Sequence, residues 1–345
     1  MNILYIGNHS GARNAAHYYK TPQKLGQGFI RNGHCFYVFN DKEEMRGHNP
    51  LNSSRLGRGK MNRRVLEIVK TFRPELIILG HCEQLLNGTL AEIREILPET
   101  RIIYRNVDPL SSPQNAAEIR GRVGHVDGIF ITSAGRGLQQ FADPKTFVCF
   151  MPNLIDPSIE TGAAFKNPHP ETDVFFAGAF LRDVAHDHRQ EAVKRLQPLL
   201  DQKGIIHDFR GSNLDDRLLY GRAYLDKLAA TKIGLCLNKK AEDYLYSSAR
   251  MAQTQGQGAL AAISRDSGFA DLFGEDEMIF YDDVGELADK ITFYAQNDKA
   301  WREAAGKSHE KAHRLFNNQT ICRYIEERSF DKPLSQDYIW PTIVY

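Results

Sequence analysis

Residues 235–283 read LCLNKKAEDYLYSSARMAQTQGQGALAAISRDSGFADLFGEDEMIFYDD, and their pattern decides the fold. An apolar run at 233–237 predicts a buried strand, and the polar residues 238–248 that follow it predict a loop. A short helix is predicted at 250–255, where glycines end it, and a second apolar strand is predicted at 259–263. This order places the loop and the start of the helix at the carboxyl edge of a parallel sheet, where open α/β sheets bind ligands.

The loop and the start of this helix carry positive charge. Lys239 and Lys240 lie in the loop, and Arg250 begins the helix. Backbone N–H groups at the start of a helix also favour an anion, so the segment is suited to bind a phosphate. An alternative is that Arg250 is a structural ion-pair partner of Asp243 or Glu242, because ion-pair networks also gather charges near clefts.

This half of the chain resembles GT-B glycosyltransferases, and in particular the spore-maturation CgeB-like family and related retaining sugar transferases. The residues that fall on the family's pattern are Arg250, Gly258, Ala259, Leu272, Phe273, Tyr281, Asp282 and Asp283. Gln253 departs from the pattern, because relatives carry at this position a glutamate that holds the ribose of the donor. Glutamine can still hydrogen-bond a hydroxyl group, but without charge.

The resemblance implies an α/β fold of the GT-B type, with two Rossmann-like domains that face each other across a cleft. Strands alternate with helices in both halves of the chain, which also favours two parallel-sheet domains. We expect an N-terminal acceptor domain at 1–164 and a C-terminal nucleotide-sugar donor domain at 171–328, joined by a short linker. The tail at 329–345 is rich in large apolar residues, and we expect it to return to the first domain as in other GT-B folds.

The resemblance further implies a donor site on the C-terminal domain. Gly178, at the end of a predicted strand, would let the donor phosphates approach the backbone, and Arg182 or Arg189 would supply charge. Relatives place the nucleotide base near the positions of Arg210 and Gly211. The full set of expected donor-binding residues is Gly178, Ala179, Arg182, Arg210, Gly211, Asn238, Lys239, Ser247, Ser248, Arg250, Gln253 and Gly258.

Polar residues follow two predicted strands of the N-terminal half. His81 comes directly after the apolar run 76–79, and Asp108 follows the strand predicted at 101–104. Because the ends of parallel strands meet at one edge of the sheet, His81 and Asp108 are candidate catalytic bases for an acceptor hydroxyl. The alternatives are a His81 that only packs or caps a helix, and an Asp108 that starts an Asp-Pro turn.

Other segments admit more than one interpretation. The turn at 7–11 either lets a ligand approach the backbone or is an ordinary tight turn, and its spacing is not that of a dinucleotide fingerprint. Residues 41–60 predict an exposed loop, whose basic side chains are either solvated or meet an anionic acceptor or a membrane surface. His186 and His188 suggest a metal, but no third ligand is evident, so we expect neither a metal nor a cofactor.

Composition sets the broad class. The 345-residue chain is 42% apolar and 25% charged, with a formal net charge of +1, as in soluble globular proteins. This near-neutral balance argues against a nucleic-acid partner. No apolar run approaches the roughly 18 residues of a membrane span, and the N-terminus reads as a strand rather than a signal peptide, so we expect at most peripheral membrane contact. The 5 widely spaced cysteines indicate free thiols in a reducing compartment, which favours the cytoplasm.

These observations predict a glycosyltransferase that moves a sugar from a nucleotide-activated donor to a hydroxyl group of a glycan, lipid-linked or protein acceptor. The resemblance leans toward a retaining, metal-independent enzyme in which fixed cations and N–H dipoles stabilise the nucleotide leaving group. Inversion stays open, with Asp108 or His81 as the base. The alternatives are a sugar-nucleotide epimerase of the same architecture, for which no convincing acidic pair is evident, and a non-catalytic sugar- or nucleotide-binding relative, which Gln253 keeps open.

Overall fold

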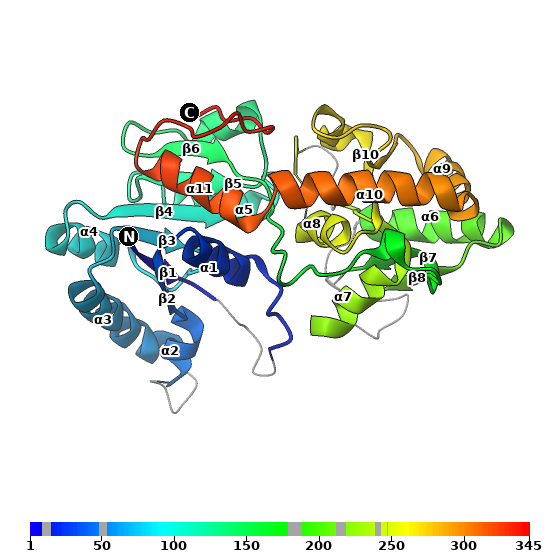
Figure 1. Ribbon diagram of the computed structural model, residues 1–345. Helices are drawn as coiled ribbons and strands as arrows, with labels where there is room; N and C mark the ends of the chain where they lie inside the picture. The colour runs from blue at the N-terminus through cyan, green and yellow to red at the C-terminus, as the bar shows by residue number, and fades with distance from the viewer. Residues whose placement is uncertain (9–14, 48–53, 179–187, 212–218, 239–242, 247) are drawn as a thin grey trace. The chain divides into compact units, whose positions relative to one another are not determined.

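The chain forms two compact units, each with its own parallel sheet (Figure 1). A computed structural model describes residues 1–8, 15–47, 54–178, 188–211, 219–238, 243–246 and 248–345. Unit 1 consists of Met1–Pro152 and Asn318–Tyr345, and unit 2 consists of Asn153–Asn317. The expected pair of parallel-sheet α/β domains is confirmed.

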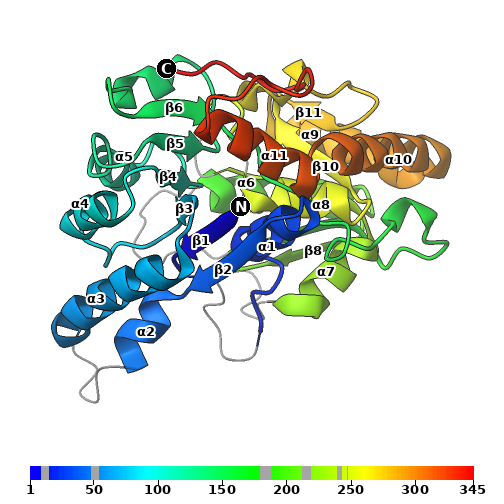
Figure 2. The same ribbon diagram turned by 60° about the vertical axis from the view of Figure 1, so that its left-hand side comes forward.

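Unit 1 is built on a six-stranded parallel sheet with the order β2-β1-β3-β4-β5-β6 (Figure 2). Its strands are β1 (Asn2–Ile6), β2 (Cys35–Phe39), β3 (Leu76–Leu79), β4 (Arg101–Asn106), β5 (Gly128–Ile131) and β6 (Phe147–Phe150). The central strands β3 and β5 are buried along their whole length, and their sequences LIIL and GIFI are apolar throughout, as strands covered on both faces require.

The helices of unit 1 come from both ends of the chain. They are α1 (Thr21–Arg31), α2 (Asp41–Gly47), α3 (Ser54–Phe72), α4 (Asn87–Ile96), α5 (Pro113–Arg120), the 3-10 helix η1 (Arg136–Phe141) and α11 (Asn318–Ser329). Helices α1 and α11 lie side by side in both views (Figures 1 and 2). A Cβ atom at Gly28 would lie 2.6 Å from the Asn318 carbonyl oxygen and 2.7 Å from Cys322 Sγ, so the missing side chain permits this close approach.

The division of the chain differs from the expected boundaries. Unit 2 begins at Asn153 rather than at 171, and the chain returns to unit 1 at Asn318, one helix before the expected tail. The reason is that the buried side of α11, which carries Ile321, Cys322 and Ile325, packs against α1 of unit 1. The tail itself follows α11 onto unit 1, where the backbones of Tyr345 and Val148 exchange hydrogen bonds of 2.9 and 3.0 Å.

The expected exposed loop at 41–60 is wrong for most of its length. Asp41 is the first residue of α2, and α3 begins at Ser54, while residues 48–53 lie outside the described residues. Helix α2 carries three acidic residues in its first turn, where they complement the helix dipole, so these charges favour a helix start rather than a loop.

Unit 2 is built on a five-stranded parallel sheet with the order β11-β10-β9-β7-β8. Its strands are β7 (Thr172–Ala177), β8 (His207–Arg210), β9 (Thr231–Leu235), β10 (Leu260–Ser264) and β11 (Ile279–Tyr281). Its helices are α6 (His188–Gln202), α7 (Gly221–Ala229), α8 (Ala249–Gly256), α9 (Val284–Gln296) and α10 (Asp298–Leu315), with short 3-10 turns η2 (Ala164–Lys166), η3 (Arg265–Ser267) and η4 (Phe269–Asp271).

Local sequence signals explain where the last helices of unit 2 begin. The Asp283 carboxylate accepts a hydrogen bond of 2.9 Å from the Glu286 backbone, and the Glu286 carboxylate accepts one of 2.7 Å from the Asp282 backbone, so each side chain satisfies a free N–H group at the start of α9. Asn297 caps α10 through the Ala300 N–H group. No helix among the described residues has the length and apolar content needed to cross a membrane.

Candidate functional site

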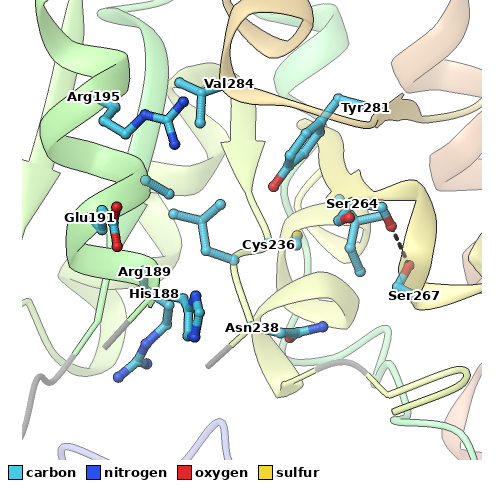
Figure 3. Close-up of a pocket in the computed structure, with 13 residues that line it drawn as sticks. His188, Arg189, Glu191, Arg195, Cys236, Asn238, Ser264, Ser267, Tyr281 and Val284 are labelled. Carbon is cyan, nitrogen blue, oxygen red and sulfur yellow. Dashed lines mark hydrogen bonds between the residues drawn. The ribbon is translucent and has the colours of Figure 1, made fainter. Parts of the chain in front are cut away.

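A pocket of about 380 Å³ opens at the carboxyl edge of the unit 2 sheet (Figure 3). The start of α6 forms one wall, and the ends of β9, β10 and β11 form the other. The lining residues are His188, Arg189, Glu191, Ala192, Arg195, Cys236, Leu237, Asn238, Ile263, Ser264, Ser267, Tyr281 and Val284. In the sheet, β8 lies on one side of β7, whereas β10 lies on the opposite side of β9. The strand order therefore reverses between β7 and β9, and open α/β sheets bind ligands beside such a reversal.

Hydrogen-bonding groups reach this pocket from both walls. Glu191 and Arg195 project from α6, and the Tyr281 hydroxyl points inward from the opposite side (Figure 3). The Asn238 amide donates from Nδ2 to the Tyr246 carbonyl over 2.8 Å, which fixes its orientation. The Asn238 Oδ1 atom is buried and has no hydrogen-bond partner among the described residues, so it can accept a hydrogen bond from a ligand hydroxyl or base N–H group.

Burial keeps two further lining groups neutral. It raises the pKa of the Cys236 thiol to about 11 and raises the pKa of the Tyr281 phenol as well. At neutral pH both groups therefore carry their protons. Their place in the pocket suits hydrogen bonding and packing rather than nucleophilic chemistry.

Arg250 joins the ends of two strands at the reversal point. Its Nε atom donates to the Ala177 carbonyl at the end of β7 over 3.0 Å, and its Nη1 atom donates to the Leu237 carbonyl just past β9 over 3.0 Å. Nη1 also lies 3.2 Å from the Ser248 hydroxyl, and the guanidinium stacks 4.8 Å from the centre of the Phe176 ring. Burial and the nearby Arg189 charge lower the pKa of Arg250, which still remains a cation.

Of the two alternative ion-pair partners of Arg250, Glu242 lies outside the described residues. The hydrogen bonds of Arg250 among the described residues go to backbone carbonyls and a hydroxyl, and they use Nε and Nη1. Nη2 faces the end of β7, since a Cβ atom on Gly178 would lie 3.5 Å from it. The guanidinium thus holds a positive charge beside the backbone position where the donor phosphates are expected.

Two expected donor ligands are already bonded to neighbours. The Gln253 side chain is 5% exposed, and its Oε1 accepts a hydrogen bond of 3.2 Å from the Tyr224 hydroxyl. Arg210 forms two parallel bonds of 2.8 and 2.9 Å with Asp208, two positions earlier on β8. Lys227 and Arg210 together hold the pKa of the Asp208 carboxyl below its usual range, against the effect of burial.

The glycines of the expected donor set differ in their placement. Gly178 follows β7, where its N–H group donates to the Arg210 carbonyl over 3.1 Å, and Gly211 directly follows β8. Gly258 instead precedes β10, at the amino edge of the sheet, with a φ of +76°. A Cβ atom there would lie 2.8 Å from the Ala164 nitrogen, so Gly258 is a packing position and its assignment to the donor site is corrected.

Part of the expected donor set lies outside the described residues. These residues are Ala179, Arg182, Lys239 and Ser247, together with Lys240 and His186. His188 is described and lines the pocket. Among the residues that the structure describes, no three His, Cys, Asp or Glu side chains are grouped to hold a metal ion.

In unit 1, His81 and Asp108 meet at the carboxyl edge of the sheet. The His81 Nε2 atom lies 3.8 Å from an Asp108 carboxylate oxygen, and its Nδ1 atom lies 4.0 Å from a Glu83 oxygen. Lys42 in turn lies 3.6 Å from Glu83. The strand-end argument correctly predicts that the polar residues after β3 and β4 approach one another.

Burial is the main cause that lowers the pKa of His81, and the Arg105 charge adds to it, while Asp108 and Glu83 oppose the shift. A neutral imidazole beside two carboxylates can accept a proton, and the resulting imidazolium would be stabilised by both. The arrangement is therefore capable of general-base chemistry at an acceptor hydroxyl.

Two further residues at this edge, Asp41 and Arg105, are absent from the predicted site. The Asp41 carboxyl is fully buried and has no hydrogen-bond partner among the described residues, and burial together with Glu83 raises its pKa to about 6. Asp41 is the second residue after the predicted strand 35–39. Polar residues that follow parallel strands gather at one edge of the sheet, so the reasoning that identifies His81 and Asp108 also applies to Asp41.

Comparisons with solved structures define the fold. Sucrose-phosphate synthase from Thermosynechococcus elongatus superimposes with a TM-score of 0.63 at 12% identity, covering 96% of this chain and 98% of that one. HepE from Anabaena, solved in complex with UDP-glucose, gives a TM-score of 0.57 at 14% identity, covering 96% of this chain and 100% of that one. TarM from S. aureus gives 0.53 at 10% identity over 81% of this chain and 59% of that one. The fold is that of the GT-B glycosyltransferases.

The comparison with family models matches a shorter part of the chain than the comparison with solved structures does. Residues 184–327 match the family model described as "Glycosyl transferase-like". This match includes most of unit 2 and therefore the pocket, Arg250 and Gln253. A search of curated proteins gave no match.

Proposed function

We propose that the protein is a glycosyltransferase that transfers a sugar, and specifically a hexose or related sugar, from a nucleotide-activated donor to an acceptor hydroxyl group. The observation that carries the proposal is the placement of the pocket. It lies at the carboxyl edge of the second sheet, beside a guanidinium that joins two strand ends, within the segment that matches a glycosyl transferase-like family model.

The charges of unit 2 support this chemistry. When the bond between the sugar and the donor phosphate breaks, negative charge grows on the phosphate oxygens. Arg250 and two cationic side chains of α6, Arg189 in its first turn and Arg195 further along it, supply fixed positive charge near that position. We propose that these side chains stabilise the leaving group without a metal ion.

Two structural neighbours were solved with ligands of the expected kind. HepE was solved in complex with UDP-glucose, and a TarM mutant was solved in complex with fondaparinux, α-GlcNAc-glycerol and UDP. By analogy we propose a nucleoside diphosphate sugar as donor and a glycan, lipid-linked or protein acceptor. The closer kinship with CgeB-like proteins and retention at the anomeric carbon are proposed on the sequence resemblance.

We assign the base to the His81–Asp108 pair in unit 1 if the enzyme inverts, with the acceptor proton passing to His81 Nε2. In a retaining enzyme the same pair would orient the acceptor. The free thiols, most of them buried, support a reducing compartment, and we propose the cytoplasm.

A nucleotide-release assay tests the proposal. The protein is incubated with UDP-, GDP-, ADP-, dTDP- and CMP-activated sugars, with and without a mixture of sugar and glycan acceptors, and the free nucleotide is quantified. A glycosyltransferase releases nucleotide from one donor class, slowly to water and faster to an acceptor. An epimerised sugar nucleotide without release would instead indicate an epimerase, and a thermal shift without turnover would indicate a binding protein.

The anomeric configuration of the product decides between retention and inversion. Proton NMR of the product formed at early time points gives the coupling constant of the anomeric proton. A configuration opposite to that of the donor would overturn the proposed retention and would make His81 and Asp108 the first candidates for the base.

A further inference from the structure

The carboxyl edge of the unit 1 sheet contains buried polar groups that the proposed transfer does not yet use. Arg105, the penultimate residue of β4, is 2% exposed, and its Nε and Nη1 atoms have no hydrogen-bond partner among the described residues. Arginine remains a cation at any physiological pH. Burying such a charge without a counter-charge is costly, so a buried unpaired guanidinium needs an explanation.

The sheet register shows which groups share a face with Arg105. Tyr5 on β1 pairs with Ile78 on β3, and Ile78 pairs with Ile103 on β4, so these side chains lie on one face of the sheet. Arg105, two residues after Ile103, lies on that face as well because side chains alternate along a strand.

A glycine after β3 makes room for the Tyr5 side chain. Gly80 directly follows β3, and a Cβ atom there would collide with the Tyr5 hydroxyl oxygen. The Tyr5 ring can therefore lean across β3 toward β4. Burial raises the pKa of the Tyr5 phenol, and Arg105 opposes that rise through its charge and a side-chain hydrogen bond, so the two groups are neighbours.

Further hydrogen-bonding groups come from β5. Arg105 pairs with Phe130, and the Thr132 N–H group donates to the Asn106 carbonyl over 3.2 Å, which continues the pairing past the end of the strand. Thr132 and Ser133 are 1% and 0% exposed, and neither hydroxyl has a hydrogen-bond partner among the described residues. Guanidinium and hydroxyl groups are the groups with which proteins bind phosphate and carboxylate oxygens.

No described carboxylate neutralises Arg105. Asp41 is equally buried, but it follows β2, which lies three strand positions from β4, or about 14 Å at the usual spacing. The carboxylates of Glu83 and Asp108 lie near His81, and the Arg105 charge acts on that imidazole. The unpaired cation therefore lies beside the proposed catalytic edge.

We propose that Arg105 binds an anionic group of the acceptor, and that the acceptor carries a phosphate or carboxylate near the hydroxyl that receives the sugar. The inference rests on the proposed function, because it assumes that this edge receives the acceptor. Arg105 supplies the charge that selects the anionic substrate, Thr132 and Ser133 donate to its oxygens, and the His81–Asp108 pair contacts the reacting hydroxyl.

Paired acceptors test the proposal. Transfer from the best donor is measured to glucose and glucose 6-phosphate, to fructose and fructose 6-phosphate, to glycerol and glycerol 3-phosphate, and to glucose and glucuronate. The wild type should prefer the anionic member of at least one pair by tenfold or more in kcat/KM. The three pairs that differ by a phosphate and the pair that differs by a carboxylate show which of the two anions the enzyme prefers. Equal use of both members, or a preference for the neutral one, overturns the proposal.

Substitutions then assign the selectivity to Arg105. Arg105→Gln should reduce the preference for the anionic acceptor by at least tenfold, and Arg105→Lys, which keeps the charge but not the planar fork, should retain part of it. The matched control is Arg101→Gln, at the opposite end of the same strand, where Arg101 is 40% exposed beside Asp127 and Asp331. The control should keep the wild-type selectivity. If Arg105→Gln loses both acceptors equally, its role is structural and the proposal is wrong.

A binding measurement separates this inference from the proposed function. Calorimetric titration of wild-type protein with glucose 6-phosphate, glycerol 3-phosphate and glucuronate needs no donor and no turnover. Arg105→Gln should abolish anion binding, and Arg101→Gln should retain it. This result would support an anion site at Arg105 even if no donor is ever hydrolysed. Transfer activity without any preference for an anion leaves the glycosyltransferase in place and rejects the role of Arg105.

Discussion

Replacing Arg250 with alanine tests whether the guanidinium at the strand reversal binds the donor or only holds the sheet together. In the structure it donates three hydrogen bonds, of 3.0, 3.0 and 3.2 Å, and stacks on Phe176. Two of its acceptors are the backbone carbonyls of Ala177 and Leu237, at the ends of neighbouring strands. The substitution removes both this link and the positive charge.

The structural part of the effect can be estimated from these contacts. A hydrogen bond from a charged donor contributes about 1.5–3 kcal/mol, and the carbonyls freed at the sheet edge can regain some of it from water. We expect Arg250→Ala to lower the unfolding free energy of unit 2 by about 3 kcal/mol. For a domain of this size that corresponds to a fall in Tm of about 6–12 °C.

The effect on the donor is separate. Loss of one partner of a desolvated charge pair typically costs about 2–5 kcal/mol, so the Kd for the nucleotide sugar should rise by at least about tenfold, or 1.4 kcal/mol. The assay is calorimetric titration with UDP, UDP-glucose and the other members of the nucleotide panel, performed well below the Tm of the variant. Arg250→Lys should recover less than half of the lost binding energy, because lysine cannot form two parallel bonds to a phosphate.

Arg302 provides a matched control in the same unit. Its Nη1 atom donates to the Phe165 and Asn167 carbonyls over 2.7 and 3.0 Å, and its guanidinium stacks 4.7 Å from the Trp301 ring. It lies near the start of α10, which packs at the amino edge of the sheet through Trp301 and Lys232. Arg302→Ala should lose similar stability and keep the wild-type Kd. If Arg250→Ala also keeps that Kd, Arg250 is a scaffold residue and our assignment fails.

Three further predictions concern titratable groups. Asp108→Asn should lower kcat by at least about tenfold while the donor Kd changes little, because Asp108 lies 3.8 Å from His81, the proposed base. Steady-state kinetics and calorimetry compare the two effects, and an equal loss of donor binding would contradict this role. The folded-state pKa of Asp41 is raised to about 6, so ionisation of this carboxyl opposes folding as pH rises through that value. Asp41→Asn should therefore raise the unfolding free energy by about 2 kcal/mol at pH 8 and change it little at pH 4. A variant that is less stable than the wild type at pH 8 would contradict this prediction. Burial, and then the neighbouring His313, lower the pKa of His309, so the stability due to its neutral form is present above pH 6.5 and is lost as pH falls below it. In urea unfolding between pH 5 and pH 8, the unfolding free energy of His309→Gln should depend less on pH than that of the wild type. An unchanged dependence of the unfolding free energy on pH would exclude this contribution.

Features that depend on a short-range pattern can be predicted from the amino-acid sequence. Alternating apolar strands and amphipathic helices predict two parallel-sheet domains, because each strand and helix carries its own periodicity. All strands of a parallel sheet end on the same side, so residues that follow them gather at its carboxyl edge. This predicts His81 and Asp108 at the carboxyl edge of the unit 1 sheet and Arg250 at that of the unit 2 sheet.

The long-range packing partner of each segment cannot be predicted in this way and follows from the tertiary structure. The pattern of α11 shows that one side is buried but not which sheet it covers, and the close approach at Gly28 assigns it to unit 1. Gly258 fits a donor motif in the sequence, yet it packs against Ala164 at the opposite edge. The burial of Asp41, and the lack of a hydrogen-bond partner for Arg105 Nε and Nη1 among the described residues, depend on several strands at once, so a pattern that predicts positions at strand ends does not reveal them.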